Sequence, residues 1–256
     1  MSAGDLAAAA RLLAAATRPV VFTGAGMSAE SGVPTFRDAQ VGLWQRFDPA
    51  QLATPAAFHA DPALVWGWYE GRRHGVRRAA PNPGHRAVAA IQARLPDTVV
   101  VTQNVDDLHD RGGAVAPVRL HGSLFAPRCS GCARPAPLPD DAGEPAGPLD
   151  PPACADCAAP VRPGVVWFGE ALPEAALAAA VEAASRCDLL LTVGTSALVH
   201  PAAEIPLVAA RLGAPVVQVN PVPTPLDAVC AVNLRGSAGE VLPALVRAAW
   251  PDAPAD

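Results

Sequence analysis

The sequence lacks several features that define whole classes of protein. It contains no lysine, so its 19 basic residues are all arginine, and 24 acidic residues outnumber them to give a formal net charge of −5. The densest basic cluster, Arg72, Arg73, Arg77 and Arg78, is short. Because proteins that bind nucleic acid usually carry an extended basic stripe, we expect no nucleic-acid partner.

Long apolar runs are also missing. No stretch approaches the roughly 20 apolar residues that a membrane-spanning helix needs. The segment from Met1 to Ala16 contains Asp5 and is typical of a helix rich in alanine and leucine. It has neither the basic start nor the cleavage pattern of a secretory signal. We therefore expect a cytoplasmic protein without a membrane partner, in which cysteines stay reduced.

What is present indicates a globular chain. Hydrophobic residues make up 51% of the 256 positions, which is enough to bury a large core and excludes a disordered protein. The 21 glycines and 29 prolines show no collagen-like period. At this length we expect one α/β domain with a small insertion.

Short runs rich in β-branched residues alternate with helical stretches. Several runs are apolar at consecutive positions, as parallel strands covered on both faces require. Asp61-Pro62 and Asn82-Pro83 each place an N-cap residue before a proline at the first helical position. The alternation predicts an α/β fold with a Rossmann-like, doubly wound parallel sheet. The predicted strands are residues 20–23, 98–102, 118–121, 165–168, 188–193, 215–220 and 229–234.

Two segments interrupt this alternation. Residues 36–78 hold three of the five tryptophans and the only tyrosine, and residues 126–162 are rich in proline and hold four cysteines. We expect these segments to form a smaller second lobe, with the ligand site in the cleft between the lobes. The expected division is a discontinuous main domain of residues 1–35, 84–125 and 163–256, a helical insertion at 36–83, and a cysteine-bearing module at 126–162.

The four cysteines of that module have the spacing Cys129-x2-Cys132-x21-Cys154-x2-Cys157. Two Cys-x-x-Cys pairs can place four thiolates on a tetrahedron, which leaves a metal no open position for water or substrate. Two disulfides or unbound thiols are the alternatives. The reducing compartment and the absence of apolar periodicity in this segment favour a metal. We predict one structural zinc ion per chain.

The first predicted strand is followed by Gly24-Ala25-Gly26-Met27-Ser28-Ala29, which fits the pattern G-x-G-x-x-G/A. Glycines in this pattern let backbone amides approach a pyrophosphate. An ordinary tight turn is the alternative. A dehydrogenase would also need a second strand that ends in an acidic residue about 20 positions later. The chain does not continue in that way, so a hydride-transfer enzyme is disfavoured.

A series of motifs resembles the sirtuin family, in the family's own order and over nearly the whole chain. The motifs are GAGMSAESGVPTFR at 24–37, TQNVD at 102–106, HGS at 121–123, the two cysteine pairs, RPGVVWFGE at 162–170 and GTS at 194–196. The resemblance implies an NAD-consuming protein-lysine deacylase with a Rossmann-like NAD-binding domain and a zinc-bearing module. Its partners would be acylated-lysine proteins, and its products nicotinamide and O-acyl-ADP-ribose.

The resemblance also implies which residues bind NAD. Phe36 would shield the reactive ribose carbon from water, and Arg37 would pair with phosphate. Gln103, Asn104 and Asp106 would follow the carboxyl end of a strand, where open α/β sheets bind ligands. The full implied set is Gly24, Ala25, Gly26, Ala29, Glu30, Thr35, Phe36, Arg37, Gln103, Asn104, Asp106, Gly194, Thr195, Ser196, Asn220 and Ala238.

His121 is the implied catalytic base, acting with Asn104 and Asp106. Imidazole is the side chain whose ordinary pKa suits proton abstraction near neutral pH. By resemblance, the acyl-lysine oxygen attacks the ribose carbon as nicotinamide leaves, and His121 then deprotonates the ribose diol. The other histidines receive structural interpretations. These place His59, His74 and His109 on helix or loop surfaces, His85 in a first helical turn, and His200 in a turn.

Tyr69 and Arg72 are three residues apart on the helix that Asp61-Pro62 begins, so both side chains lie on one face. The flanking sequence resembles the sirtuin branch that removes acidic acyl groups, in which a Tyr-x-x-Arg pair binds a distal carboxylate. This implies desuccinylase or demalonylase activity, with deacetylase activity retained. Asp38, where many family members have glycine, is a departure. The implied substrate-binding residues are Tyr69, Arg72, Val165, Phe168 and Gly169.

Three alternatives stay open at this point. The chain could act mainly as a deacetylase, or it could transfer single ADP-ribose groups to proteins. It could also sense NAD or redox state without turnover. Nicotinamide release in the presence of an acyl peptide would distinguish a sensor from both enzymes, and covalent labelling of protein by NAD would identify the transferase.

Overall fold

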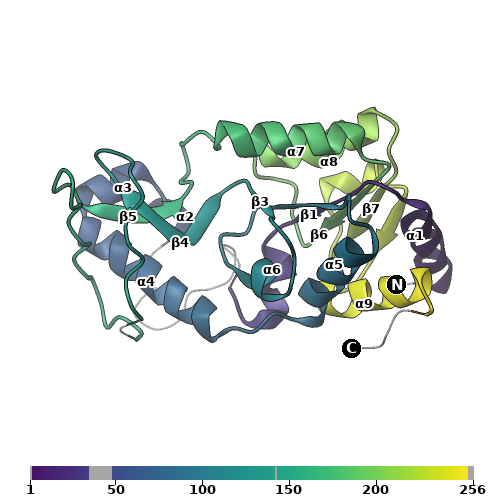
Figure 1. Ribbon diagram of the computed structural model, residues 1–256, viewed down its shortest axis with the longest axis horizontal. Helices are drawn as coiled ribbons and strands as arrows, with labels where there is room; N and C mark the ends of the chain where they lie inside the picture. The colour runs from purple at the N-terminus through teal and green to yellow at the C-terminus, as the bar shows by residue number, and fades with distance from the viewer. Residues whose placement is uncertain (1, 35–47, 142, 253–256) are drawn as a thin grey trace.

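The computed structural model describes residues 2–34, 48–141 and 143–252. The expected cofactor-loop residues Thr35, Phe36 and Arg37 lie outside these ranges. Figure 1 shows two parts side by side. We call the part that holds the six-stranded sheet the large lobe, and the part that holds the two-stranded sheet the small lobe. The first and last helices, α1 and α9, both lie in the large lobe (Figure 1).

The six strands of the large lobe are all parallel and have the order β3-β2-β1-β6-β7-β8. Their bounds are β1 (Pro19–Thr23), β2 (Val99–Thr102), β3 (Val118–Arg119), β6 (Leu189–Val193), β7 (Val216–Val219) and β8 (Val232–Leu234). The winding direction reverses between β1 and β6, and open α/β sheets bind ligands at such a reversal. The predicted Rossmann-like, doubly wound sheet is confirmed.

Helices cover both faces of this sheet (Figure 1). One face is covered by α1 (Ala3–Ala15), α5 (Pro83–Arg94) and α9 (Ala238–Ala249), and the other by α7 (Glu174–Arg186) and α8 (Ile205–Arg211). The short helices of this lobe are α6 (Leu108–Arg111), η1 (Ala25–Met27), η2 (Ala29–Ser31), η4 (Ala202–Glu204) and η5 (Pro225–Ala228).

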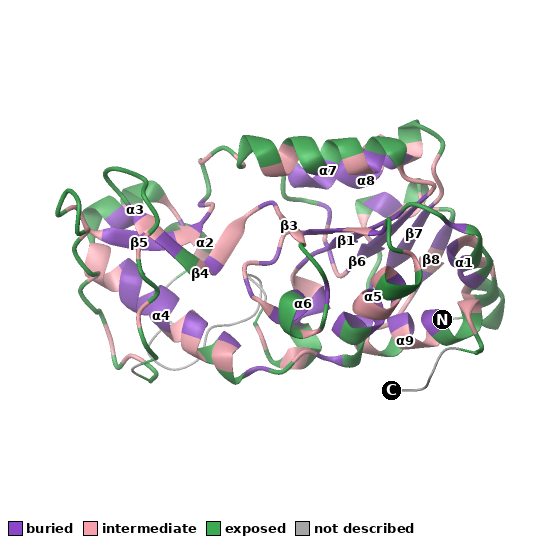
Figure 2. Ribbon diagram, viewed as in Figure 1, coloured by how far each residue is buried: buried purple, intermediate pink, exposed green. Residues whose placement is uncertain are grey.

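Two separate cores explain why the strands are apolar at consecutive positions. Val21 and Val100 belong to the core with α1, α5 and α9, while their neighbours Val20 and Val101 belong to the core with α7 and α8. Successive side chains of a strand point to opposite faces. Both must therefore be apolar when both faces are covered, and the central strands β1, β6 and β7 are buried at every position (Figure 2).

The small lobe has less regular structure. It contains α2 (Pro49–Leu52), α3 (Pro55–Ala60), α4 (Pro62–Arg78) and an antiparallel pair formed by β4 (Gly122–Cys129) and β5 (Val161–Val165). The predicted strand at residues 165–168 is wrong in its bounds and its sheet. The extended segment ends at Val165 and pairs with β4, a strand that the sequence analysis did not predict.

Both predicted helix starts are confirmed. The Asp61 carboxylate accepts a hydrogen bond from Leu64 N at the start of α4, and Asn82 Oδ1 accepts from Gly84 N at the start of α5. Proline follows each cap residue, where its missing N–H costs nothing.

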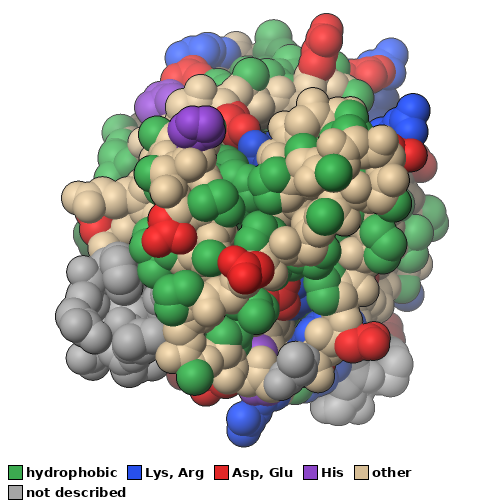
Figure 3. Space-filling view, turned by 90° about the vertical axis from the view of Figure 1, so that its left-hand side faces the viewer, with side chains coloured by type: hydrophobic (Ala, Val, Ile, Leu, Met, Phe, Trp, Pro, Cys, Tyr) green, Lys and Arg blue, Asp and Glu red, His purple; other side chains and the backbone are tan. Residues whose placement is uncertain are grey.

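Figure 3 shows the end of the small lobe, where hydrophobic side chains are scattered over the face, acidic groups are few and separate, and arginines lie mainly toward the rim. Within the described ranges, no helix is long and apolar enough to cross a membrane.

Candidate functional site

The glycine turn after β1 packs directly against the turn after β6. Gly24 N–H donates to Val193 O at 2.9 Å, and Gly26 N–H donates to Gly194 O at 2.8 Å. A Cβ on Gly24 would lie 2.9 Å from Gly194 O, and one on Gly26 would lie 2.8 Å from Gly194 Cα. Gly194 itself has φ +61°. Only glycines allow the two turns to pack this closely, and both turns lie at the reversal of the sheet.

Polar residues that follow three different strands are joined here. Gln103, after β2, donates through Nε2 to Thr195 Oγ1 at 3.0 Å, and Asn220, after β7, donates through Nδ2 to Thr195 O at 2.7 Å. Thr195 and Asn220 are buried, and Ser196 beside them is half-buried. The structure thus brings these four implied NAD-binding residues to one edge of the sheet.

A buried serine connects Asn104 with Asp106. Ser28 Oγ donates to Asp106 Oδ2 at 2.9 Å and accepts from Asn104 Nδ2 at 3.1 Å. His85 Nε2 lies 3.4 Å from Ser28 Oγ. Burial raises the pKa of Asp106, and hydrogen bonds from Leu108 N and Ser28 act in the opposite direction. Ser28 therefore fixes the orientation of both side chains that the resemblance implied to act with His121.

Two buried histidines lie behind this serine. The rings of His85 and His109 are 5.1 Å apart, and each side chain is almost fully buried. His109 Nε2 contacts Thr23 Oγ1 at 3.0 Å. The interpretation of His109 as a surface residue is therefore wrong, because α6 turns it into the large lobe. Burial lowers the pKa of His85 to about 3 and that of His109 to about 4.

His121 lies between β3 and β4, where the two lobes join. Its Nδ1 is 3.0 Å from Gln103 O. A carbonyl only accepts, so Nδ1 carries the hydrogen and Nε2 keeps its lone pair. Burial lowers the pKa of His121, and the bond to Gln103 O acts in the opposite direction. The imidazole is therefore a neutral base at pH 7.

The segment after β5 reaches His121 through its backbone. Val166 N–H donates to His121 O at 2.9 Å, and Phe168 N–H donates to Ala53 O at 2.9 Å. Val165 is buried, Phe168 is largely exposed, and Gly169 adopts φ +87°. The first contact holds the start of this segment next to His121, and the second joins Phe168 to the end of α2.

Glu30 lies at the beginning of α9 rather than over the glycine turn. Its carboxylate accepts from Ser237 Oγ at 2.8 Å and from Gly239 N at 2.6 Å. Ala238, between those two partners, is buried, whereas Ala29 is exposed. Glu30 and Ala238 are therefore brought together by the first turn of α9, where a carboxylate is favourable.

Tyr69 and Arg72 share one face of α4, as predicted from their spacing. Tyr69 is buried, and its hydroxyl oxygen accepts from Trp167 Nε1 at 3.0 Å. The Arg72 guanidinium lies 5.2 Å from the centre of the Trp68 ring. Burial lowers the pKa of Arg72, and the nearby Tyr69 and Asp106 act in the opposite direction.

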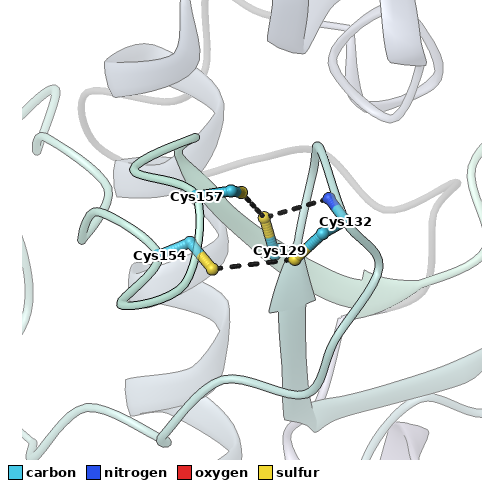
Figure 4. Close-up of side chains that lie close together, drawn as sticks. All are labelled: Cys129, Cys132, Cys154 and Cys157. Atoms are coloured by element: carbon cyan, nitrogen blue, oxygen red, sulfur yellow. Dashed lines mark hydrogen bonds between the residues drawn. The ribbon is translucent and has the colours of Figure 1, made fainter.

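The four predicted metal ligands converge at the tip of the small lobe (Figure 4). Their Sγ atoms all lie within 4.8 Å of one another, with 3.4 Å between Cys129 and Cys157 and 3.8 Å between Cys132 and Cys154. A tetrahedral site with zinc–sulfur distances of about 2.3 Å requires sulfur atoms about 3.8 Å apart. The cluster therefore fits a closed structural zinc site.

Several residues that shape the site have contacts that the sequence did not predict. Ser28 was part of a quoted motif, but nothing in its type predicted contacts with three side chains. His85 was assigned to a first helical turn, which its bond from Asn82 N confirms, but its second nitrogen reaches Ser28. Trp167 and Glu170 also lie in a quoted motif. Their roles depend on contacts with α4 and β5 that no local pattern reveals.

A family model described as the Sir2 family matches residues 24–201 of this chain. The match spans the glycine turn, His121, the cysteine cluster and the turn after β6. It covers more than half of the chain.

Several known proteins are similar to this chain over most of their length. An NAD-dependent protein deacylase of Methylococcus capsulatus is 59% identical over 231 residues, which is 89% of this chain and 91% of that protein. NAD-dependent protein deacylase 1 of Pseudomonas aeruginosa is 60% identical over 248 residues, 95% of this chain and 99% of that protein. The solved structure of a Sir2 homologue in complex with NAD is 44% identical and has a TM-score of 0.86, with 93% of this chain and 91% of that chain covered.

Proposed function

The chain belongs to the Sir2 family and is an NAD-dependent protein deacylase, and from that premise we propose that its acyl pocket prefers acyl groups that end in a carboxylate. Succinyl- and malonyl-lysine are the substrates with this chemistry, and acetyl-lysine would be a weaker one. The related proteins are named deacylases, so protein mono-ADP-ribosyl transfer is not favoured. The observation that carries the proposal is the face of α4 that the buried Tyr69 shares with the half-buried Arg72.

The edge of the sheet would hold NAD, whose ribose carbon accepts the acyl oxygen as nicotinamide leaves. The glycine turn after β1 fits a dinucleotide because it lies at the reversal of the sheet, where backbone amides can approach a pyrophosphate. Gln103, Thr195 and Asn220 supply polar groups beside it. Asn104 and Asp106, oriented by Ser28, would bind the nicotinamide ribose and carboxamide.

His121 is suited to act as the general base. The bond from Nδ1 to Gln103 O fixes the tautomer and leaves Nε2 as the proton acceptor. Burial keeps the pKa below its ordinary value, so the imidazole is unprotonated at neutral pH. Its backbone bond to Val166 holds the base beside the segment that would bind the acyl-lysine.

The acyl preference rests on charge and burial. A guanidinium partly withdrawn from water against an aromatic ring is stabilised by a carboxylate, which makes charge-assisted hydrogen bonds with it. Burial raises the pKa of Tyr69 to about 12, so its phenol stays protonated and can donate to the same carboxylate. An acetyl group offers neither residue a charged acceptor.

The decisive experiment replaces Arg72 with methionine, which keeps the apolar stem and removes the charge. A hydrogen bond to a charged group is worth about 1.5–3 kcal/mol. We therefore expect kcat/KM for a succinyl peptide to fall by roughly 10–150-fold. The ratio of kcat/KM for the acetyl version of the same peptide to that for the succinyl version should rise correspondingly. Tyr69→Phe removes only the hydroxyl and should shift the ratio several-fold in the same direction.

Arg78→Met is the matched control, because Arg78 is an exposed residue of the same helix. It should leave the ratio of the two activities unchanged. Equal losses of both activities in Arg72→Met would indicate general damage. An unchanged ratio would show that Arg72 does not read the acyl group, and the proposal would be wrong.

A further inference from the structure

We propose that Trp167 is a positioning residue for acyl selectivity, with its indole N–H holding the Tyr69 oxygen so that the phenol hydrogen points to the carboxylate of the acyl group. The inference rests on the proposed preference for acidic acyl groups and deepens it. It assigns a function to a residue that follows β5 and lies outside the Tyr-x-x-Arg pair.

The hydrogen bond between Trp167 and Tyr69 can run in only one direction. Indole Nε1–H can only donate, so at 3.0 Å it must donate to the Tyr69 oxygen. This bond occupies an acceptor position of the phenol and leaves the phenol hydrogen for another partner. Among the residues that the structure describes, Tyr69 has no acceptor for that hydrogen. A carboxylate at the end of an acyl chain supplies one.

The indole of Trp167 is in turn held by Arg162 and Glu170. The Arg162 guanidinium lies 3.4 Å from the centre of the Trp167 ring, closer than most cation–π contacts. Glu170 binds that guanidinium at both carboxylate oxygens, at 2.6 Å and 2.9 Å, and also accepts from Trp167 N at 2.9 Å. Glu170 therefore fixes the backbone of Trp167 directly and its ring through Arg162.

The indole is buried in the apolar cluster of the small lobe, where Phe58 is an aromatic neighbour with ring centres 5.3 Å apart. Apolar packing holds the ring in place, and the hydrogen bond from its N–H to Tyr69 adds a directional contact that packing does not supply. Trp167→Phe removes this directional contact and keeps an aromatic ring at the position.

The chain contains a single tyrosine, which allows a test that is independent of activity. Tyrosine labelled with ¹³C at Cζ gives one NMR signal, that of Tyr69, and its shift reports hydrogen bonds at the phenol. In the wild-type enzyme with NAD analogue bound, we expect a succinyl-lysine peptide to move this signal and an acetyl-lysine peptide to move it less. Trp167→Phe should move the signal of the free protein and abolish the difference between the two peptides.

Kinetics supply the second readout. A neutral hydrogen bond is worth a few-fold in binding, so Trp167→Phe should lower the succinyl-to-acetyl ratio of kcat/KM by about 3–10-fold, mainly through KM for the succinyl peptide. The double variant with Tyr69→Phe should be no worse than Tyr69→Phe alone, because the indole would act only through the phenol. Trp250→Phe, in the large lobe, is the matched control and should leave the ratio unchanged.

The outcomes separate this inference from the proposed function. If Arg72→Met and Tyr69→Phe leave the ratio unchanged, the acidic-acyl preference itself is wrong. If they change it but Trp167→Phe neither moves the NMR signal nor changes the ratio, only the role of Trp167 is wrong. Additive losses in the double variant would also overturn it. Should Trp167→Phe fail to fold, the peptide dependence of the wild-type signal still decides whether the phenol contacts the acyl carboxylate.

Discussion

The large lobe and the small lobe are stabilised by different interactions. In the large lobe, parallel strands are buried on both faces by helices, and two apolar cores account for the packing. The small lobe has one apolar cluster around α4, and beyond apolar packing it depends on ion pairs, a cation–π contact and four clustered cysteines. From this difference we infer that each lobe has its own role. The regular sheet edge of the large lobe positions NAD and the proposed base, and the irregular contacts of the small lobe shape the acyl pocket.

Removal of the metal should reveal the largest difference in stability between the two lobes. Structural zinc contributes about 10–16 kcal/mol of folding free energy in small zinc modules. We expect one zinc ion per chain, and strong chelation should unfold residues 126–162 and disturb the small lobe. The helices and strands of the large lobe should persist, as far-ultraviolet circular dichroism would show. Restoration by added zinc is the control, and a fully active metal-free protein would contradict the structural assignment.

Replacement of the proposed base, His121, tests whether the large lobe supplies the catalytic group. General acid–base steps contribute about 10²–10⁴-fold, so His121→Ala should lower kcat by that range for succinyl and acetyl peptides alike. Melting temperature and NAD affinity should change little, because the side chain makes one hydrogen bond to a backbone carbonyl. His59→Ala, at an exposed position in α3, serves as the control. A loss of less than about fivefold would exclude His121 as the base.

Mild acid should weaken the large lobe first. The buried His109 has a pKa of about 4, against about 6.5 in the unfolded chain. Between these values the unfolded state binds more protons, so the free energy of unfolding falls as pH decreases through this window. At pH 5, protonation of His109 in the unfolded chain lowers the free energy of unfolding by about 2 kcal/mol relative to neutral or higher pH. His85, with a pKa of about 3, adds to the same trend.

The ion pair between Glu170 and Arg162 in the small lobe responds at lower pH. Burial would raise the pKa of Glu170, but hydrogen bonds from Arg162 and from Trp167 N lower it overall. The stabilisation from this carboxylate is therefore present above its unfolded pKa and is lost only as pH falls below that value. Denaturant unfolding at pH 7 and pH 5 measures the difference. His109→Gln should flatten the pH dependence in this range, and an unchanged slope would contradict the assignment.

Sequence and structure agree best where local chemistry decides the outcome. Asp61 and Asn82 begin their helices as predicted, because a side-chain cap and a following proline act within a few residues. The strands of the large lobe were recognisable because two-sided burial leaves continuous apolar runs. β4 could not be recognised in this way, since its exposure alternates irregularly between Gly122 and Cys129 and its partner lies more than 30 residues away. The burial of His109 likewise depends on how α6 packs.

The smallest effect concerns two glycines of α4 that differ only in what surrounds them. Glycine in the middle of a helix costs about 0.5–1 kcal/mol relative to alanine. A Cβ on Gly75 would meet nothing within 4 Å, so Gly75→Ala should stabilise the protein by about that amount. A Cβ on Gly67 would lie 2.6 Å from Gly147 O and 3.0 Å from Leu149 N, where the proline-rich segment of the cysteine module crosses the helix.

Backbone atoms cannot move aside as the end of a flexible side chain can, and forcing extra volume into a packed contact costs about 1–3 kcal/mol. Gly67→Ala should therefore be destabilising by about 1 kcal/mol, opposite in sign to its helix propensity. Paired thermal melts of the two variants provide the measurement. If both variants were stabilised equally, the segment at Gly147 would not pack against α4, and the small lobe would depend less on these backbone contacts than the structure indicates.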